Sequence, residues 1–161
     1  MHDFHEKSKV WIYLSDRVFT SDEESSIQHS LNQFVKEWTA HGANLKASGE
    51  IRFNRFIILM VDETAAGASG CSIDKSVHFI KSIENQYGVQ LFNRMLFAWK
   101  RGEEVFVSHL NKLQELFDHG EITGDTIVFN NLVATKKERN EKWMVPLKDS
   151  WMSARLMKQK V

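Results

Sequence analysis

The segment from Gly67 to His78 carries residue types suited to binding a small anion. It follows an apolar run and is expected to lead into a helix, whose first turn offers unpaired N–H groups and a partial positive charge. Glycines let a ligand approach the backbone, while serine hydroxyls and a lysine add donors. The pattern predicts a phosphate or carboxylate site; alternatively, the glycines form a turn and Ser72 caps the helix. The predicted ligand-binding residues are Asp62, Glu63, Ser69, Gly70, Cys71, Ser72, Lys75 and Ser76.

A thiol chemistry is the second hypothesis for this segment. Cys71 is the one cysteine of the chain and stands at the expected helix start, where the helix dipole and Lys75 favour a thiolate. A thiol-dependent enzyme also needs a base near its nucleophile, and Asp62, Glu63 and His78 are the candidates. His78 lies seven residues further on, about 10 Å along the helix axis, which disfavours a direct pair. The alternative is that Cys71 packs the helix onto a sheet.

Two acidic residues, Asp62 and Glu63, follow the apolar run from Phe56 to Val61. Adjacent residues of an extended chain point to opposite faces, so one carboxylate can face a site while the other faces solvent. They are candidates for holding a metal ion or acting as a general base, or they simply form a polar strand end. The seven histidines show no metal-ligand spacing, so no metal site and no cofactor is predicted.

The same residues bear a partial likeness to nucleotide-binding motifs. An apolar run ending in Asp62-Glu63 is similar to a Walker B strand, and Gly70 with Lys75-Ser76 is similar to a broken phosphate loop. A true phosphate loop has glycine directly before its lysine, whereas Asp74 occupies that place here and would face the phosphates. Nucleotide hydrolysis is therefore the least favoured of the three functional hypotheses.

Three motifs stand within the stretch from Arg55 to Phe92: Val61-Asp62-Glu63, Ala68 to Ile80, and Tyr87-Gly88-Val89. Trp143 and Pro146-Leu147 follow further along the chain. On these residues the chain resembles a small family of uncharacterised proteins from Bacteroidetes-type bacteria, whose members often carry the automatic label "ABC transporter ATPase". The resemblance implies no established activity and no functional residues.

The elements that must position these residues follow from apolar spacing. Strands are expected over residues 10–14, 45–53, 56–61, 95–99, 105–107 and 126–135. One helix begins at a capping box formed by Ser21 and Glu24, a second runs from about Ile73 to Gly88, and a third covers residues 110–117. The order predicts one α+β domain over residues 1–161: a ferredoxin-like split βαβ sheet with helices on one face and a C-terminal extension.

Composition narrows the class of protein. The formal net charge is zero, so nothing global favours nucleic acid, although the residues from Lys136 onward carry eight Lys or Arg against three Asp or Glu. The sequence shows neither a signal sequence nor a membrane-spanning run, and its single cysteine fits a reducing compartment. We therefore expect a cytoplasmic, non-enzymatic binding protein with its ligand at residues 62–76. Its partner is a small anion or another protein, and the many aromatic residues also allow a homodimer.

Overall fold

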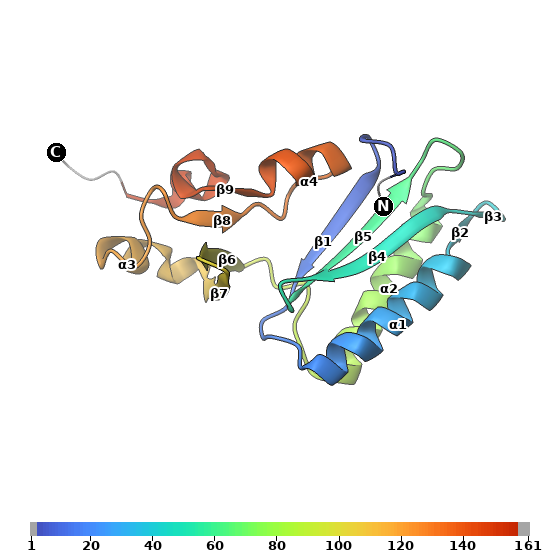
Figure 1. Cartoon of the computed structure of the whole chain (residues 1–161), viewed down its shortest axis with the longest axis horizontal. Coiled ribbons are helices and arrows are strands. Elements are labelled where there is room, and N and C mark those ends of the chain that lie inside the picture. Colours follow the sequence, from blue (N-terminus) through green and yellow to red (C-terminus); the bar gives the residue numbers. More distant parts are fainter. Residues whose placement is uncertain (1–2, 158–161) are drawn as a thin grey trace.

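The computed structural model describes residues 3–157, and its first layer is an antiparallel sheet of three strands (Figure 1). The strands are β1 (Lys9–Leu14), β4 (Lys46–Arg52) and β5 (Phe56–Asp62), in the order β1-β5-β4. All residues of β5 are buried, as the continuous apolar run predicts for a strand covered on both faces. β4 lies on one edge of this sheet and β1 on the other.

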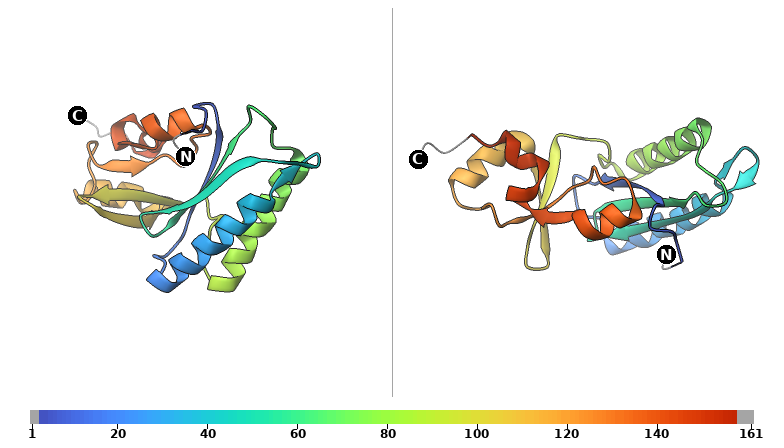
Figure 2. Two further views of the ribbon diagram at one scale, coloured as in Figure 1. Left: turned by 45° about the vertical axis from the view of Figure 1, so that its right-hand side comes forward. Right: turned by 90° about the horizontal axis from the view of Figure 1, so that it is seen from above.

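Two helices, α1 (Ser21–Glu37) and α2 (Gly70–Tyr87), cover one face of this sheet (Figures 1 and 2). Thr20 is the N-cap of α1 and forms the capping box with Glu23, one residue before the predicted pair. Ser69 is the N-cap of α2, so the predicted cap Ser72 lies inside the first turn. Gly88 ends α2, as predicted, and it adopts the left-handed conformation. No helix within residues 3–157 combines the length and apolar character needed to cross a membrane.

Strand alternation divides the first sheet between two cores. Ile57, Leu59 and Val61 of β5 face the helices and pack with Ile27 and Leu31 of α1 and with α2. Gly49 of β4 permits a close approach of α1, because a Cβ at this position would lie 3.1 Å from Leu31 Cδ2. The alternate residues of β5 face away from the helices. Beyond α1, the chain makes a small hairpin, β2 (Thr39–Ala40) and β3 (Ala43–Asn44).

A second antiparallel sheet of four strands packs on the other face of the first. It contains β6 (Leu96–Arg101), β7 (Glu104–His109), β8 (Ile127–Phe129) and β9 (Met144–Pro146), in the order β7-β6-β8-β9. Its connections include α3 (Leu113–Asp118) and α4 (Lys136–Lys142). The core between the two sheets contains Val10, Leu14, Phe56, Ile58, Met60, Ala98, Phe129, Val133 and Trp143. The outer face of the second sheet packs on α3 and on the 3₁₀ turns near Leu147 and Met152.

The predicted α+β class is confirmed. The split βαβ unit is also present, because α1 follows β1 and precedes β4 in the chain, and β5 lies between these two edge strands in the sheet. The fourth strand of a ferredoxin-like sheet would pair with β1, but β6 lies in the second sheet. There β6 buries Phe97 and Trp99 on one face and Ala98 on the other. If β6 paired with β1 instead, the second sheet would lose the strand that joins β7 to β8. The outer edge of β1 is consequently not covered by β6.

The C-terminal third differs most from the expectation. The predicted strand over residues 126–135 is shorter and ends at Phe129, and α4 was not anticipated because its residues include none that are buried. Trp143 is fully enclosed between the two sheets, where it meets Phe56 and Phe129. The buried Trp143 ring therefore attaches the segment before β9 to both sheets.

Candidate functional site: the outer edge of β1

Asp62, predicted as a ligand or base, is buried at the end of β5 and engaged by the backbone. Its carboxylate accepts hydrogen bonds from the N–H of Thr64 at 3.0 Å and of His5 at 3.1 Å. Lys46 Nζ lies 3.5 Å from the same group. The two backbone hydrogen bonds are the main reason that the pKa of Asp62 is held well below its usual range. Asp62 therefore fastens the N-terminal segment to the sheet.

Glu63 performs a similar task for the following loop. Its Oε2 accepts a 2.7 Å hydrogen bond from the N–H of Ala68, and its Oε1 lies 3.2 Å from Lys9 Nζ. A Cβ at Gly67 would come within 2.9 Å of Oε2, so a larger residue there would make the end of the Glu63 side chain shift. The carboxylate holds the loop from Thr64 to Ser69 in place.

The serines at the start of α2 are occupied with capping. Ser69 Oγ accepts from the N–H of Ser72 at 3.1 Å, and Ser72 Oγ accepts from the N–H of Ser69 at 2.6 Å. Ser76 is buried and donates to the carbonyl of Ile73 at 2.6 Å. Gly70 and Lys75 are exposed beside this cap. The predicted ligand-binding residues lie at the end of β5, in the following loop and at the start of α2. The hydroxyls of Ser69, Ser72 and Ser76 bond to backbone groups of this same segment.

Cys71 and His78 are both exposed on α2. Within residues 3–157, neither the thiol of Cys71 nor the ring of His78 makes a hydrogen bond or ion pair, so no nucleophile–base pair is formed there. In the same range, no three His, Cys, Asp or Glu side chains gather in a way that could hold a metal ion.

A cleft of about 640 Å³ lies beside β1, at the position a fourth strand would have taken. Its walls come from β1, α2, the chain from Leu91 into β6, the chain from the end of β8 to Ala134, and the last 3₁₀ turn. Three of its large apolar side chains are partly or largely exposed: Phe92 at 37%, Trp151 at 40% and Leu132 at 71%. The lining residues are Val10, Trp11, Ile12, Tyr13, Leu14, Val77, Leu91, Phe92, Asn93, Arg94, Leu96, Phe97, Phe129, Asn131, Leu132, Val133, Ala134, Trp151 and Met152.

One end of the β1 edge is paired by the chain itself. The N–H of Val10 donates to the carbonyl of Ala134 at 3.0 Å, and the N–H of Lys136 donates to the carbonyl of Ser8 at 2.8 Å. Lys9 and Thr135 form an antiparallel bridge between these two hydrogen bonds. An extended segment of this protein therefore already adds to the edge of β1 at its N-terminal end.

Beyond Val10 the edge is open. Because hydrogen-bonded and non-bonded pairs alternate along an antiparallel ladder, the outward N–H of Val10 implies that Ile12 and Leu14 also point away from β5. The N–H and C=O groups of Ile12 and Leu14 have no hydrogen-bond partner within residues 3–157. These groups face the apolar cleft, and Ile12 and Leu14 are both among its lining residues.

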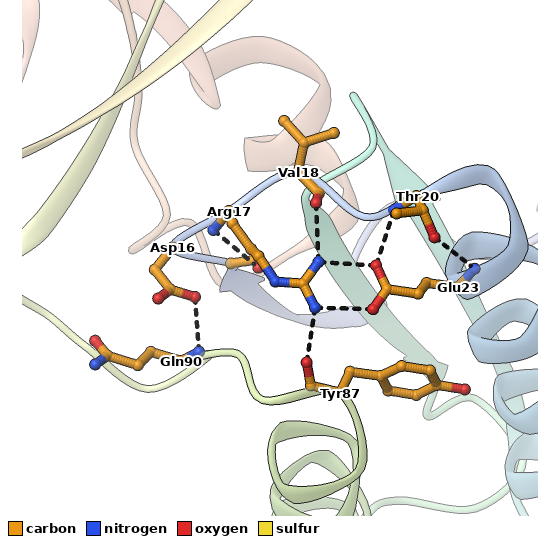
Figure 3. A network of polar contacts seen from close by, with 8 residues as sticks. Asp16, Arg17, Val18, Thr20, Glu23, Tyr87 and Gln90 are labelled. Carbon is orange, nitrogen blue, oxygen red and sulfur yellow. Dashed lines mark hydrogen bonds and ion pairs between the residues drawn. The ribbon is translucent and has the colours of Figure 1, made fainter.

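A polar network fixes the Leu14 end of the cleft (Figure 3). Arg17 donates two hydrogen bonds of 2.8 Å to the Glu23 carboxylate and one of 2.7 Å to the carbonyl of Tyr87. The adjacent Asp16 accepts from the N–H of Gln90 at 2.8 Å, and its own N–H donates to the Gln90 carbonyl at 3.2 Å. The network joins the end of β1, the start of α1 and the end of α2, so it positions the cleft wall that follows Gln90.

The Arg17–Glu23 pair is the strongest electrostatic feature of this network. The hydrogen bonds from Arg17, and after them the one from the Thr20 N–H, lower the pKa of Glu23 to about 2. Its partner responds in the opposite sense, since hydrogen bonding to Glu23 raises the pKa of Arg17. Both groups are thus held in their charged forms, which keeps the network intact at neutral pH.

Sequence reasoning did not find this cleft, because its walls come from five separate parts of the chain. The one available signal was a pair of large aromatic residues outside the predicted apolar stripes, Phe92 and Trp151. The sequence does not reveal which strand lies at the edge of a sheet, since an edge strand and an inner strand can carry the same apolar residues.

Comparison with protein-family models, with curated proteins and with solved structures finds no match to this chain. The resemblance of residues 55–92 to the uncharacterised bacterial family stays a prediction.

Proposed function

We propose that this protein is a non-enzymatic binding protein that receives an extended peptide segment at the outer edge of β1. The observation that carries this proposal is the unpaired backbone of Ile12 and Leu14 beside an apolar cleft of about 640 Å³. An exposed strand edge is a template for another strand, and addition of a peptide strand is a known mode of recognition. The edge of β1 replaces residues 62–76 as our candidate ligand site.

The polar groups of the cleft favour a peptide over an apolar small molecule. Outward N–H and C=O groups recur at every second residue of β1, about 7 Å apart, and only another extended backbone matches that spacing. The pairing of Val10 with Ala134 is a precedent within the same chain. A ligand lacking a peptide backbone would leave the groups of Ile12 and Leu14 unpaired, which costs free energy when they are covered.

The two faces of an added strand would meet different walls. Side chains on one face would lie near Tyr13, Val77 and Phe92, on the side of α2, and those on the other face near residues of the second sheet. Both walls are mainly apolar, so the ligand is expected to carry β-branched residues, whose methyl groups contact the walls, at successive positions.

The test uses a peptide of about seven alternating valine and threonine residues, acetylated at one end and amidated at the other. Its binding is followed by fluorescence anisotropy, and hydrogen exchange of the Ile12 and Leu14 amides is followed by NMR. Strand addition predicts slower exchange at these two amides. A peptide N-methylated at every second residue, in the register facing β1, should no longer bind. Unchanged exchange at both amides in the presence of saturating peptide would overturn the proposal.

A pair of matched variants locates the site. Leu132 lines the cleft and is 71% exposed, whereas Met157 lies outside it and is 74% exposed. Leu132→Ser should weaken peptide binding by roughly tenfold, the effect of losing one apolar contact, and Met157→Ser should leave it unchanged. Equal effects of the two substitutions would place the peptide elsewhere.

A further inference from the structure

Arg94 is the one charged residue in the lining of the cleft. It is exposed, and its guanidinium makes no hydrogen bond, ion pair or ring contact with the residues that the structure describes. The two asparagines of the lining are committed elsewhere: Asn93 bonds to Gln90 and to the N–H of Met95, and Asn131 accepts from the indole of Trp143. Arg94 therefore offers uncommitted charged donors at an apolar site.

The open part of the β1 edge, at Ile12 and Leu14, is bounded at both ends by backbone groups that already pair within the chain. Toward its N-terminus, Ala134 and Lys136 already pair with Val10 and Ser8. Toward its C-terminus, the N–H of Asp16 bonds to Gln90. A segment from the middle of a chain would have to turn out of the cleft twice, whereas a chain end has to turn only once.

The charge of Arg94 selects between the two kinds of chain end. A guanidinium repels a terminal ammonium group and binds a terminal carboxylate through two parallel hydrogen bonds. From the unpaired Arg94 and the doubly closed edge, we infer that the ligand is the C-terminal tail of a protein, with apolar residues along β1 and its α-carboxylate on Arg94. This inference rests on the strand addition proposed above, and it specifies that the added strand is the C-terminal end of a chain.

The test compares three versions of the valine–threonine peptide, each titrated into the full chain. The first has an acetylated N-terminus and a free C-terminal acid, the second is blocked at both ends, and the third has a free amine and a C-terminal amide. The free acid should bind about three- to tenfold more tightly than the blocked peptide, and the free amine should bind most weakly. Added salt should reduce the difference between the acid and the blocked peptide.

Variants of Arg94 separate charge from packing. Arg94→Gln should make the acid and the blocked peptide bind equally, and Arg94→Lys should retain part of the preference. Lys36→Gln removes the same charge from the distant α1 and should leave the preference intact. A preference for the acid that survives Arg94→Gln would overturn the inference.

The remaining outcomes distinguish this inference from the proposed function. Equal binding of the acid and the blocked peptide, with slowed exchange at Ile12, would remove the carboxylate recognition and leave strand addition standing. No binding of any version would remove both. Dodecanoate supplies a carboxylate on an apolar chain without a peptide backbone. If it competes as well as the peptide acid and leaves the exchange of Ile12 unchanged, both ideas fail in favour of a fatty-acid site.

Discussion

The indole N–H of Trp38 donates a 2.8 Å hydrogen bond to the carbonyl of Ser72, joining the end of α1 to the first turn of α2. Trp38 is fully enclosed and also packs against Trp11 and Phe34. Phe34 in turn stacks on Phe79 of α2. The start of α2 is thus held by the helix that precedes it as well as by its own cap.

Replacing Trp38 with phenylalanine should loosen this junction. Trp38→Phe removes the indole donor and part of a buried ring, so the free energy of unfolding should fall by about 1 to 3 kcal/mol. Denaturant unfolding measures the loss. The exchange of the Ser72 and Ile73 amides, which bond to Ser69, should also quicken more than that of the β6 amides. Uniform quickening of both sets would show that Trp38 acts through global stability alone.

Gly49→Ala should destabilise the contact between β4 and α1. The new methyl group would lie 3.1 Å from Leu31 Cδ2 and 3.2 Å from Leu31 Cβ, so Leu31 must move by a few tenths of an ångström. Overpacking of this kind costs about 1 to 3 kcal/mol of unfolding free energy, measurable in urea. Gly124→Ala is the control, because its nearest neighbour would lie at an ordinary 3.5 Å. Equal stability of the two variants would contradict the close approach.

Acid should weaken the network at the Leu14 end of the cleft. The pKa of Glu23 is lowered from 4.5 to about 2, so its contribution to stability is complete above pH 4.5 and is lost as the pH falls toward 2. Glu23→Gln should therefore reduce the stability difference measured by urea unfolding between about pH 7 and about pH 3. Glu24→Gln is the matched control, since the side chain of Glu24 makes no hydrogen bond with Arg17, Thr20 or Glu23. An unchanged pH dependence in Glu23→Gln would rule out this linkage.

Alkali should act through Tyr13, which lines the cleft and meets Phe92 edge-on at 5.3 Å. Burial raises the pKa of Tyr13 from 10 to about 12. The protonated phenol is favoured in the folded state, so this contribution is complete below pH 10 and is lost as the pH rises through 12. The loss amounts to roughly 2 to 3 kcal/mol. Tyr13→Phe should remove this part of the alkaline decline. Tyrosinate absorbance during a pH titration would contradict the assignment if Tyr13 ionised near pH 10.

Phosphate tests the anion hypothesis for the start of α2. Since Ser69 and Ser72 bond to each other and Glu63 lies beside Gly67, we expect no rise in melting temperature when phosphate is added. Sulfate and ADP with magnesium should behave in the same way. A rise that Lys75→Ala abolishes would restore the site at residues 62–76.

Local pattern was sufficient to predict much of the first layer. The apolar runs of β1 and β5, the stripe of α1 and the glycine after α2 all depend on neighbours close in sequence. The α1 cap was predicted one residue late because both Thr20–Glu23 and Ser21–Glu24 have the capping-box spacing. Only the backbone conformation at Thr20 decides between them.

The amino-acid sequence by itself determined the class of this protein, the positions of its main strands and helices, and the segment richest in polar groups. The tertiary structure decided what those groups do. It turned Asp62 toward the N–H groups of His5 and Thr64, and it placed β6 in a second sheet. The Asp62–Thr64 bond is local, but the Asp62–His5 bond and the pairing of β6 with β8 join residues far apart in the chain, which local spacing does not encode. The open edge of β1 follows from the placement of β6, because the strand that would pair with β1 pairs with β7 and β8 instead.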